Sequence, residues 1–375
     1  MKAENSLIKI NIDASKFSFH MLDSKDLNFS LEYSKDEVID IYGIAYTIRL
    51  FELECEKFFN NKQIRGFCHL VIGQENIYAA LKKVMHTDDY SISSYRCHGL
   101  AYITGSTISE IVGEMLGKAG GNSKGMGGSM HLYNKNFFGG HGIVGAQIPL
   151  GLGLAFSQKY KEIANTSFPS ESNEKAAHEH SKSNANQSIY NNFPLKNVTF
   201  CFYGDGASNQ GQIYESFNMA HLWKLPVVFI CENNKYGMWT AVDKASADNN
   251  FYKRSNYIPG IRIDHSNTFE IIEVLKFARD YALKSGPIIV EIDCYRLCGH
   301  SLRDKNELRN INEVEEEKAK DPLILLRKNI MEFKPEEYIL KIEEQLKNIV
   351  FNEIKNAENM CKPNPEMLYE NILSK

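Results

Sequence analysis

The chain has 375 residues, 43% of them hydrophobic and 24% charged, so it can bury a large core as one large α/β domain or about two domains. Its formal net charge of −4 comes with dispersed Lys and Arg residues, which disfavours a nucleic-acid partner. No apolar run approaches the ~20 residues of a membrane-spanning helix, so we expect no membrane anchor.

The 8 cysteines include no Cys-x-x-Cys pair, and most lie in apolar segments. This pattern favours buried free thiols in a reducing compartment over disulfides or a zinc site.

Residues 1–33 are expected to form an N-terminal extension. Met1 to Asp26 contains acidic residues and no arginine, unlike a mitochondrial presequence. We therefore predict a bacterial-type cytoplasmic protein, with the mitochondrial matrix as the alternative.

Two helices are expected next. Ser34 and Glu37 form a capping-box pattern at the start of a helix that runs to about Phe59 with an apolar face of helical period. Gln74 to Val84 is predicted to form the second helix.

Glycine is concentrated between Gly117 and Gly153, which hold 12 of the 25 glycines with apolar residues between them. This composition indicates backbone in unusual conformations or in close approach to another group. The segment 165–197 is different, because its polar composition predicts a solvated surface insertion without chemistry.

The centre of the chain reads as strand, helix, strand. Val198 to Tyr203 and Val227 to Cys231 are short β-branched and aromatic runs, and Gln212 to Lys224 between them has helical character. This order predicts a parallel sheet, in which Asp205 and Asn234 follow neighbouring strand ends and point into one crevice.

Carboxylate, amide and backbone carbonyl oxygens suit Mg²⁺ held together with substrate phosphates. Asp205 and Asn234 would supply two such ligands. Gly204 and Gly206 would let the backbone approach an anion at the start of the next helix. A tight turn without a ligand is the alternative interpretation.

After Asn234 we expect a strand at 261–264, a helix at about 268–283 and a strand at 287–293, which places His300 at another carboxyl edge. Residues 312–375 are charged and helical. The predicted domains are therefore the extension 1–33, an α/β domain over 34–311 and a helical C-terminal region over 312–375.

Several motifs together resemble the alpha subunits of the thiamine diphosphate-dependent 2-oxo acid dehydrogenase family, and within it those of pyruvate enzymes. The first is Gly-Asp-Gly at 204–206, followed after 26 residues by Asn233-Asn234. The others are Ile64 to Leu70, Tyr95 to Gly99, Lys124 to His131, Gly142 to Gln147 and Gly299 to Ser301. The resemblance spans about 33–322, except for the 165–197 insertion. It implies the thiamine diphosphate-binding fold, a largely parallel sheet with helices on both faces and a helical C-terminal extension.

The resemblance also implies site residues. His69 and His300 match catalytic histidines near the cofactor and the oxo acid. Asp205, Asn234 and the Tyr236 carbonyl match the Mg²⁺ ligands. The implied thiamine diphosphate contacts are His69, Tyr95, Arg96, Asn134, Gly142, Val144, Asp205, Gly206, Ala207, Asn234, Tyr236 and His300, although a surface salt bridge is the alternative role for Arg96.

The implied reaction is oxidative decarboxylation of pyruvate with reductive acetylation of a lipoyl group on the acetyltransferase. No glutamate here matches the family's activating residue, so the resemblance implies a beta-subunit partner in an α2β2 assembly. A branched-chain 2-oxo acid or acetoin dehydrogenase and a non-catalytic scaffold remain open. A nicotinamide enzyme is disfavoured because the dinucleotide glycine fingerprint is absent.

Overall fold

The computed structural model describes residues 7–167, 194–304 and 309–370. Most of the predicted insertion, including residues 168–193, lies outside the described residues, as do the first six residues of the predicted N-terminal extension.

A seven-stranded sheet forms the centre of the molecule, with strand order β2-β10-β11-β7-β6-β4-β5. Its strands are β2 (Ser18–His20), β4 (Tyr90–Ser94), β5 (Phe137–His141), β6 (Thr199–Gly204), β7 (Val227–Asn233), β10 (Gly260–Asp264) and β11 (Ile288–Asp293). All neighbours pair in parallel except β2, which runs antiparallel to β10. The predicted largely parallel α/β sheet is confirmed.

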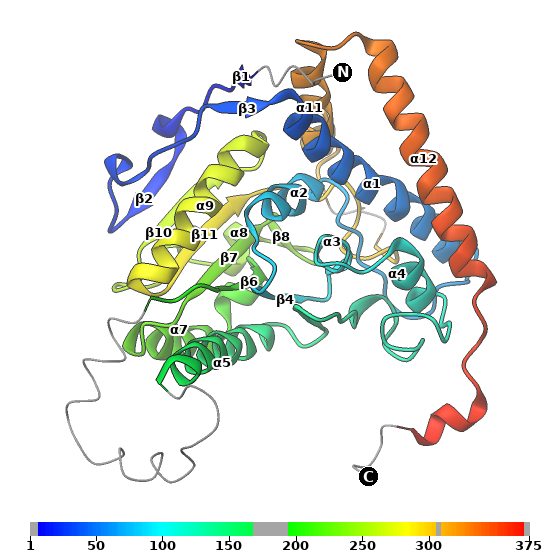
Figure 1. Cartoon of the computed structure of the whole chain (residues 1–375), viewed down its shortest axis with the longest axis horizontal. Helices are drawn as coiled ribbons and strands as arrows, with labels where there is room; N and C mark the ends of the chain where they lie inside the picture. Colours follow the sequence, from blue (N-terminus) through cyan, green and yellow to red (C-terminus); the bar gives the residue numbers. More distant parts are fainter. Residues whose placement is uncertain (1–6, 168–193, 305–308, 371–375) are drawn as a thin grey trace.

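Helices cover both faces of this sheet (Figure 1). One face packs on α2 (Glu75–Val84) and α9 (Thr268–Ser285), and the other on α5 (Gln147–Ser167) and α7 (Gly211–Leu222). Side chains of β6 alternate between the two cores: Phe200 and Phe202 join one, whereas Cys201 and Tyr203 join the other. A strand buried on both faces explains why the sequence of β6 is continuously apolar.

A second group of helices surrounds the α2 side of the sheet. The helix α1 (Lys35–Asn60) begins with the predicted capping box between Ser34 and Glu37. It packs against α11 (Pro322–Met331) and α12 (Glu336–Asn359), while α10 (Ile311–Ala319) precedes them. The short helices α3 (His98–Ile103) and α4 (Ile108–Met115) connect this group to β4 and β5.

The N-terminal segment is tied to the rest of the fold. Strand β1 (Leu7–Lys9) pairs with β3 (Glu32–Ser34), and β2 extends the main sheet at the β10 edge. The predicted boundaries at 34 and 311 stay predictions. The segment before residue 34 supplies an edge strand of the main sheet, β2.

The described helices include none that is both long and apolar enough to cross a lipid bilayer. All 8 cysteines are free, and most of them are buried.

Candidate active site

A cavity of about 890 Å³ opens at the carboxyl ends of β4, β6 and β7. Its lining includes eleven of the twelve residues implied as cofactor contacts: His69, Tyr95, Arg96, Gly142, Val144, Asp205, Gly206, Ala207, Asn234, Tyr236 and His300. These residues come from segments far apart in the sequence. The parallel strands bring them together because each strand ends at the same edge of the sheet.

The twelfth residue, Asn134, does not belong to the cavity lining. Its amide nitrogen donates hydrogen bonds to the Ala101 carbonyl, Thr104 Oγ1 and Ser106 Oγ. Its amide oxygen accepts from the Phe137 backbone N–H. Asn134 therefore fixes the turn before β5, and its role as a cofactor contact stays a prediction.

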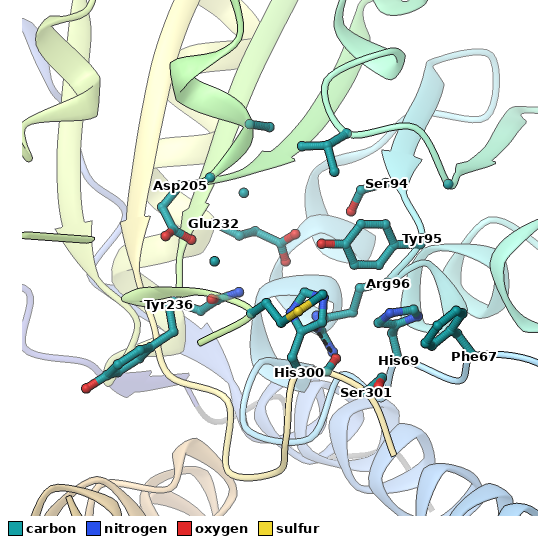
Figure 2. A pocket seen from close by; sticks show the side chains of 18 of the residues that line it. Phe67, His69, Ser94, Tyr95, Arg96, Asp205, Glu232, Tyr236, His300 and Ser301 are labelled. Atoms are coloured by element: carbon teal, nitrogen blue, oxygen red, sulfur yellow. Dashed lines mark hydrogen bonds between the residues drawn. The ribbon is translucent and has the colours of Figure 1, made fainter. Parts of the chain in front are cut away.

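Two histidines and a tyrosine meet at one side of the cavity (Figure 2). The ring centroids of His69 and His300 are 5.2 Å apart, and that of Tyr95 lies 4.3 Å from His69. Burial, followed by the charge of Arg96, lowers the pKa of His69 to about 2 and that of His300 to about 3. Both imidazoles are therefore neutral near pH 7 in the free chain.

Arg96 is buried and donates hydrogen bonds to two backbone carbonyls, those of Leu70 and His300. The alternative of a surface salt bridge is thus wrong for this residue. Arg96 instead connects the segment that carries His69 to the segment that carries His300.

Arg296 is a second buried cation beside the cavity. Its Nη2 donates to the Tyr236 carbonyl at 2.9 Å and its Nε to Asn234 Oδ1 at 3.2 Å. Within the described residues, its Nη1 is buried and lacks a hydrogen-bond partner, as does His69 Nδ1. Burial and the neighbouring Arg96 lower the pKa of Arg296 to about 9.

These cations test whether the site fits a diphosphate. Buried charges in proteins are normally paired. Here the charges of Arg96 and Arg296 lower the pKa of both His69 and His300, and the charge of Arg96 also lowers the pKa of Arg296, so the positive charge is not fully neutralised. An anionic ligand would supply the missing negative charge and acceptors for the unpartnered donors. The residues present therefore fit a diphosphate group.

Asp205 is the hard anionic ligand expected for a divalent cation. It follows β6 directly and is only 4% exposed. Burial raises the pKa of its carboxyl group, while the charge of Arg296 acts in the opposite direction. A bound cation would offset the cost of keeping this carboxylate ionised.

Glu232 is a cavity residue whose role the sequence did not reveal. It is the penultimate residue of β7, two positions before Asn234, and its carboxyl accepts hydrogen bonds from the Tyr78 hydroxyl and the Gln74 amide. Burial raises its pKa to about 7. Figure 2 shows its carboxyl group turned towards the Tyr95 side of the cavity. An acid beside Asn233-Asn234 was the available signal, but it reads as part of an apolar strand.

The cavity mouth carries exposed apolar side chains. Phe67, Val144, Met238 and Trp239 line it and are between 41% and 60% exposed. Met238 has a φ of +58°, a conformation that is uncommon for a residue with a side chain. A rim of this kind is typical of a surface that a partner covers.

Comparisons with known proteins agree with this geometry. Residues 45–366 match the family described as "Dehydrogenase E1 component". The chain is 41% identical to the mitochondrial pyruvate dehydrogenase E1 component subunit alpha of Schizosaccharomyces pombe, over 97% of this chain and 82% of the relative. It is 40% identical to the Saccharomyces cerevisiae protein of the same name, over 87% of this chain and 70% of the relative. It is also 40% identical to the human testis-specific form, over 90% of this chain and 79% of the relative.

These relatives correct one prediction and establish the family. All three are mitochondrial forms from eukaryotes, so the predicted bacterial cytoplasmic location is wrong, and they point to the mitochondrial matrix. The prediction of location rested on the composition of residues 1–26 alone, and this composition does not decide where the protein resides. The match over 45–366 and these identities show that the chain belongs to the dehydrogenase E1 component family.

Proposed function

We propose that this chain is the alpha-type subunit of a pyruvate dehydrogenase, EC 1.2.4.1, which binds thiamine diphosphate, decarboxylates pyruvate and transfers the acetyl unit to a lipoyl group. Family membership implies the cofactor, and the names of the relatives favour pyruvate over a branched-chain oxo acid. The observation that carries the proposal is the single cavity that gathers eleven of the twelve implied contacts.

Within this cavity we assign Mg²⁺ to Asp205, Asn234 and the Tyr236 carbonyl. Three oxygen ligands from protein, completed by diphosphate oxygens and water, suit an octahedral ion. Arg96 and the backbone at Gly206 and Ala207 would hold the diphosphate. Tyr95, Gly142 and Val144 line the remaining wall.

When bound, thiamine diphosphate supplies the nucleophilic carbon and the electron sink that decarboxylation of an oxo acid needs. The residues of this chain bind and orient. His69 and His300 are neutral in the free chain. A bound diphosphate would offset the charge of Arg96, which lowers the pKa of both imidazoles, so that they could take a proton from a substrate in the cavity or return one to it. Arg96 holds both histidine segments in place through their backbone carbonyls.

We further propose that a beta subunit completes the site in an α2β2 assembly. The exposed apolar rim at Phe67, Val144, Met238 and Trp239 supports a covering partner. The lipoyl domain of the acetyltransferase would then reach the cavity through the opening that the assembly leaves.

The test is pyruvate decarboxylation with thiamine diphosphate and Mg²⁺, measured for this chain alone and for the chain co-expressed with its beta subunit. Activity only in the pair supports both the pyruvate assignment and the shared site. Activity of the chain alone contradicts the shared site and makes Glu232 the candidate activating acid. Activity only with other oxo acids would move the proposal to a branched-chain enzyme.

A further inference from the structure

Arg296 contacts two of the three groups that we assign to the cation. It follows β11 on the segment that leads to His300, its side chain is fully buried, and it hydrogen bonds to Asn234 Oδ1 and the Tyr236 carbonyl. Its charge also acts on the third group, the Asp205 carboxyl.

We propose that Arg296 is a positioning residue for the divalent cation, which fixes the orientation of the two uncharged oxygen ligands. This inference rests on the proposed function. Amide and carbonyl oxygens each have two lone pairs, so one can accept from Arg296 while the other faces a cation. Arginine can only donate, and the side of Asn234 that faces Arg296 must therefore be its oxygen.

The opposite side of the Asn234 amide is held as well. Its nitrogen donates to Gln74 Oε1 at 3.5 Å, and the Gln74 amide nitrogen donates to Glu232 Oε1 at 3.1 Å. Arg296 on one side and Gln74 on the other leave the amide a single orientation. Partners of this outer kind commonly decide how well a metal ligand is presented.

Charge and hydrogen-bond geometry give opposite expectations for Arg296. A buried guanidinium repels a nearby cation, so charge alone predicts that its removal would strengthen cation binding. The positioning role predicts weaker binding, because the amide of Asn234 and the carbonyl of Tyr236 would lose their shared donor. The sign of the change in affinity therefore separates the two.

The experiment titrates Mn²⁺, an oxygen-preferring substitute for Mg²⁺, into the full chain assembled with its beta subunit at saturating thiamine diphosphate. Electron paramagnetic resonance measures free Mn²⁺. We expect R296M to weaken Mn²⁺ binding by about 10- to 100-fold. R296K keeps the buried charge but not the two-pronged donor, so it should also weaken binding. It carries the test if R296M does not fold.

The matched control is R279K on α9, because Arg279 is also buried and donates to the Asp89 carboxylate away from the cavity lining. It should leave Mn²⁺ affinity unchanged. Tighter or unchanged Mn²⁺ binding in R296M, or in R296K where R296M does not fold, overturns the positioning role while leaving the proposed function intact. A wild-type assembly that binds no Mn²⁺ would instead overturn the cation assignment in the proposed function.

Discussion

Arg96 donates a hydrogen bond from Nη2 to the His300 carbonyl at 2.9 Å, across 204 residues of sequence. Its Nη1 donates to the Leu70 carbonyl, next to His69. One guanidinium therefore holds the two histidine-bearing segments together at the edge of the cavity. The same side chain is our proposed diphosphate partner, so anion binding and histidine placement share a residue.

This double role predicts a large effect of R96K. Lysine keeps the charge but lacks the planar fork, so it cannot hold both carbonyls and an anion together. We expect thiamine diphosphate affinity to fall by at least about tenfold, a loss of about 1.4 kcal/mol or more, measured by calorimetry with Mg²⁺ fixed. R279K makes the same exchange at another buried arginine and should bind the cofactor normally. Equal affinities for R96K and wild type would remove Arg96 from the diphosphate site.

The second prediction concerns Asp205. D205A removes one hard oxygen ligand from an ion that demands near-octahedral coordination, so Mg²⁺-dependent cofactor binding should be abolished. The measurement is calorimetric titration of thiamine diphosphate with and without Mg²⁺. D264A, at the exposed carboxyl end of β10, is the matched control and should retain the Mg²⁺ dependence. Mg²⁺-dependent binding that survives in D205A contradicts the cation assignment.

Much of the centre of the fold could be predicted from sequence. The β6, α7 and β7 elements lie within two residues of their predicted bounds at each end, because continuous apolar runs and a helical period are strong local signals. Strand β5 was missed because it contains Gly139 and Gly140, which normally weaken a strand. A Cβ on Gly140 would lie 2.4 Å from the Met130 carbonyl, so the strand needs glycine for close packing.

The candidate site, like the fold, could be predicted from the sequence only in part. Residues at strand ends, such as Asp205, carry a sequence signal because the chain reverses there after an apolar run. The role of Arg296 has no such signal, since it depends on Asn234 and Tyr236, about 60 positions earlier in the chain. The role of Asn134 stays a prediction, because the residue lies outside the cavity lining and its amide hydrogen bonds to Thr104, Ser106 and Phe137.

His300 provides the third prediction. H300A removes the imidazole but keeps the backbone carbonyl that Arg96 holds, so the segment should stay in place. We expect turnover of the assembled enzyme to fall by about 10²- to 10⁴-fold, the usual contribution of a proton-transferring group. Cofactor affinity should change less than threefold, about 0.65 kcal/mol. Loss of cofactor binding in H300A would mean that the imidazole is structural.

The fourth prediction is a pH dependence of stability. The pKa of His300 is lowered to about 3 by burial, so the unfolded chain binds more protons than the folded chain between about pH 3 and 6.5. Stability should therefore rise with pH through this window and fall on acidification. At pH 5 one such histidine costs about 2 kcal/mol of the free energy of unfolding.

H300Q removes this proton-linked cost, because glutamine does not titrate. Urea unfolding at pH 5 and pH 7 should show a smaller difference for H300Q than for wild type. H86Q, at an exposed histidine, controls for the substitution itself. The same pH difference in H300Q and wild type would show that His300 does not exclude a proton in the folded chain.

The last prediction concerns the glycine-rich segment before β5, which a single buried carboxylate organises. Glu114 on α4 is fully buried, and its two oxygens accept from the backbone N–H groups of Ser123, Gly125, Gly127 and Gly128 at 2.7 to 3.0 Å. This segment leads to Met130, which lines the cavity. Glu114 therefore links the stability of α4 to the shape of the cavity wall.

E114Q replaces one acceptor oxygen with an NH₂ group, which cannot accept and would face backbone donors. Losing two charge-assisted hydrogen bonds and leaving their donors buried should cost about 3 kcal/mol or more of the free energy of unfolding, measured by urea denaturation. E110Q on the same helix is the matched control, because Glu110 belongs to a capping box in which glutamine also serves. If E114Q unfolds at the same urea concentration as E110Q, the carboxylate is not what holds the glycine-rich segment in place, and the packing of its apolar residues must do so instead.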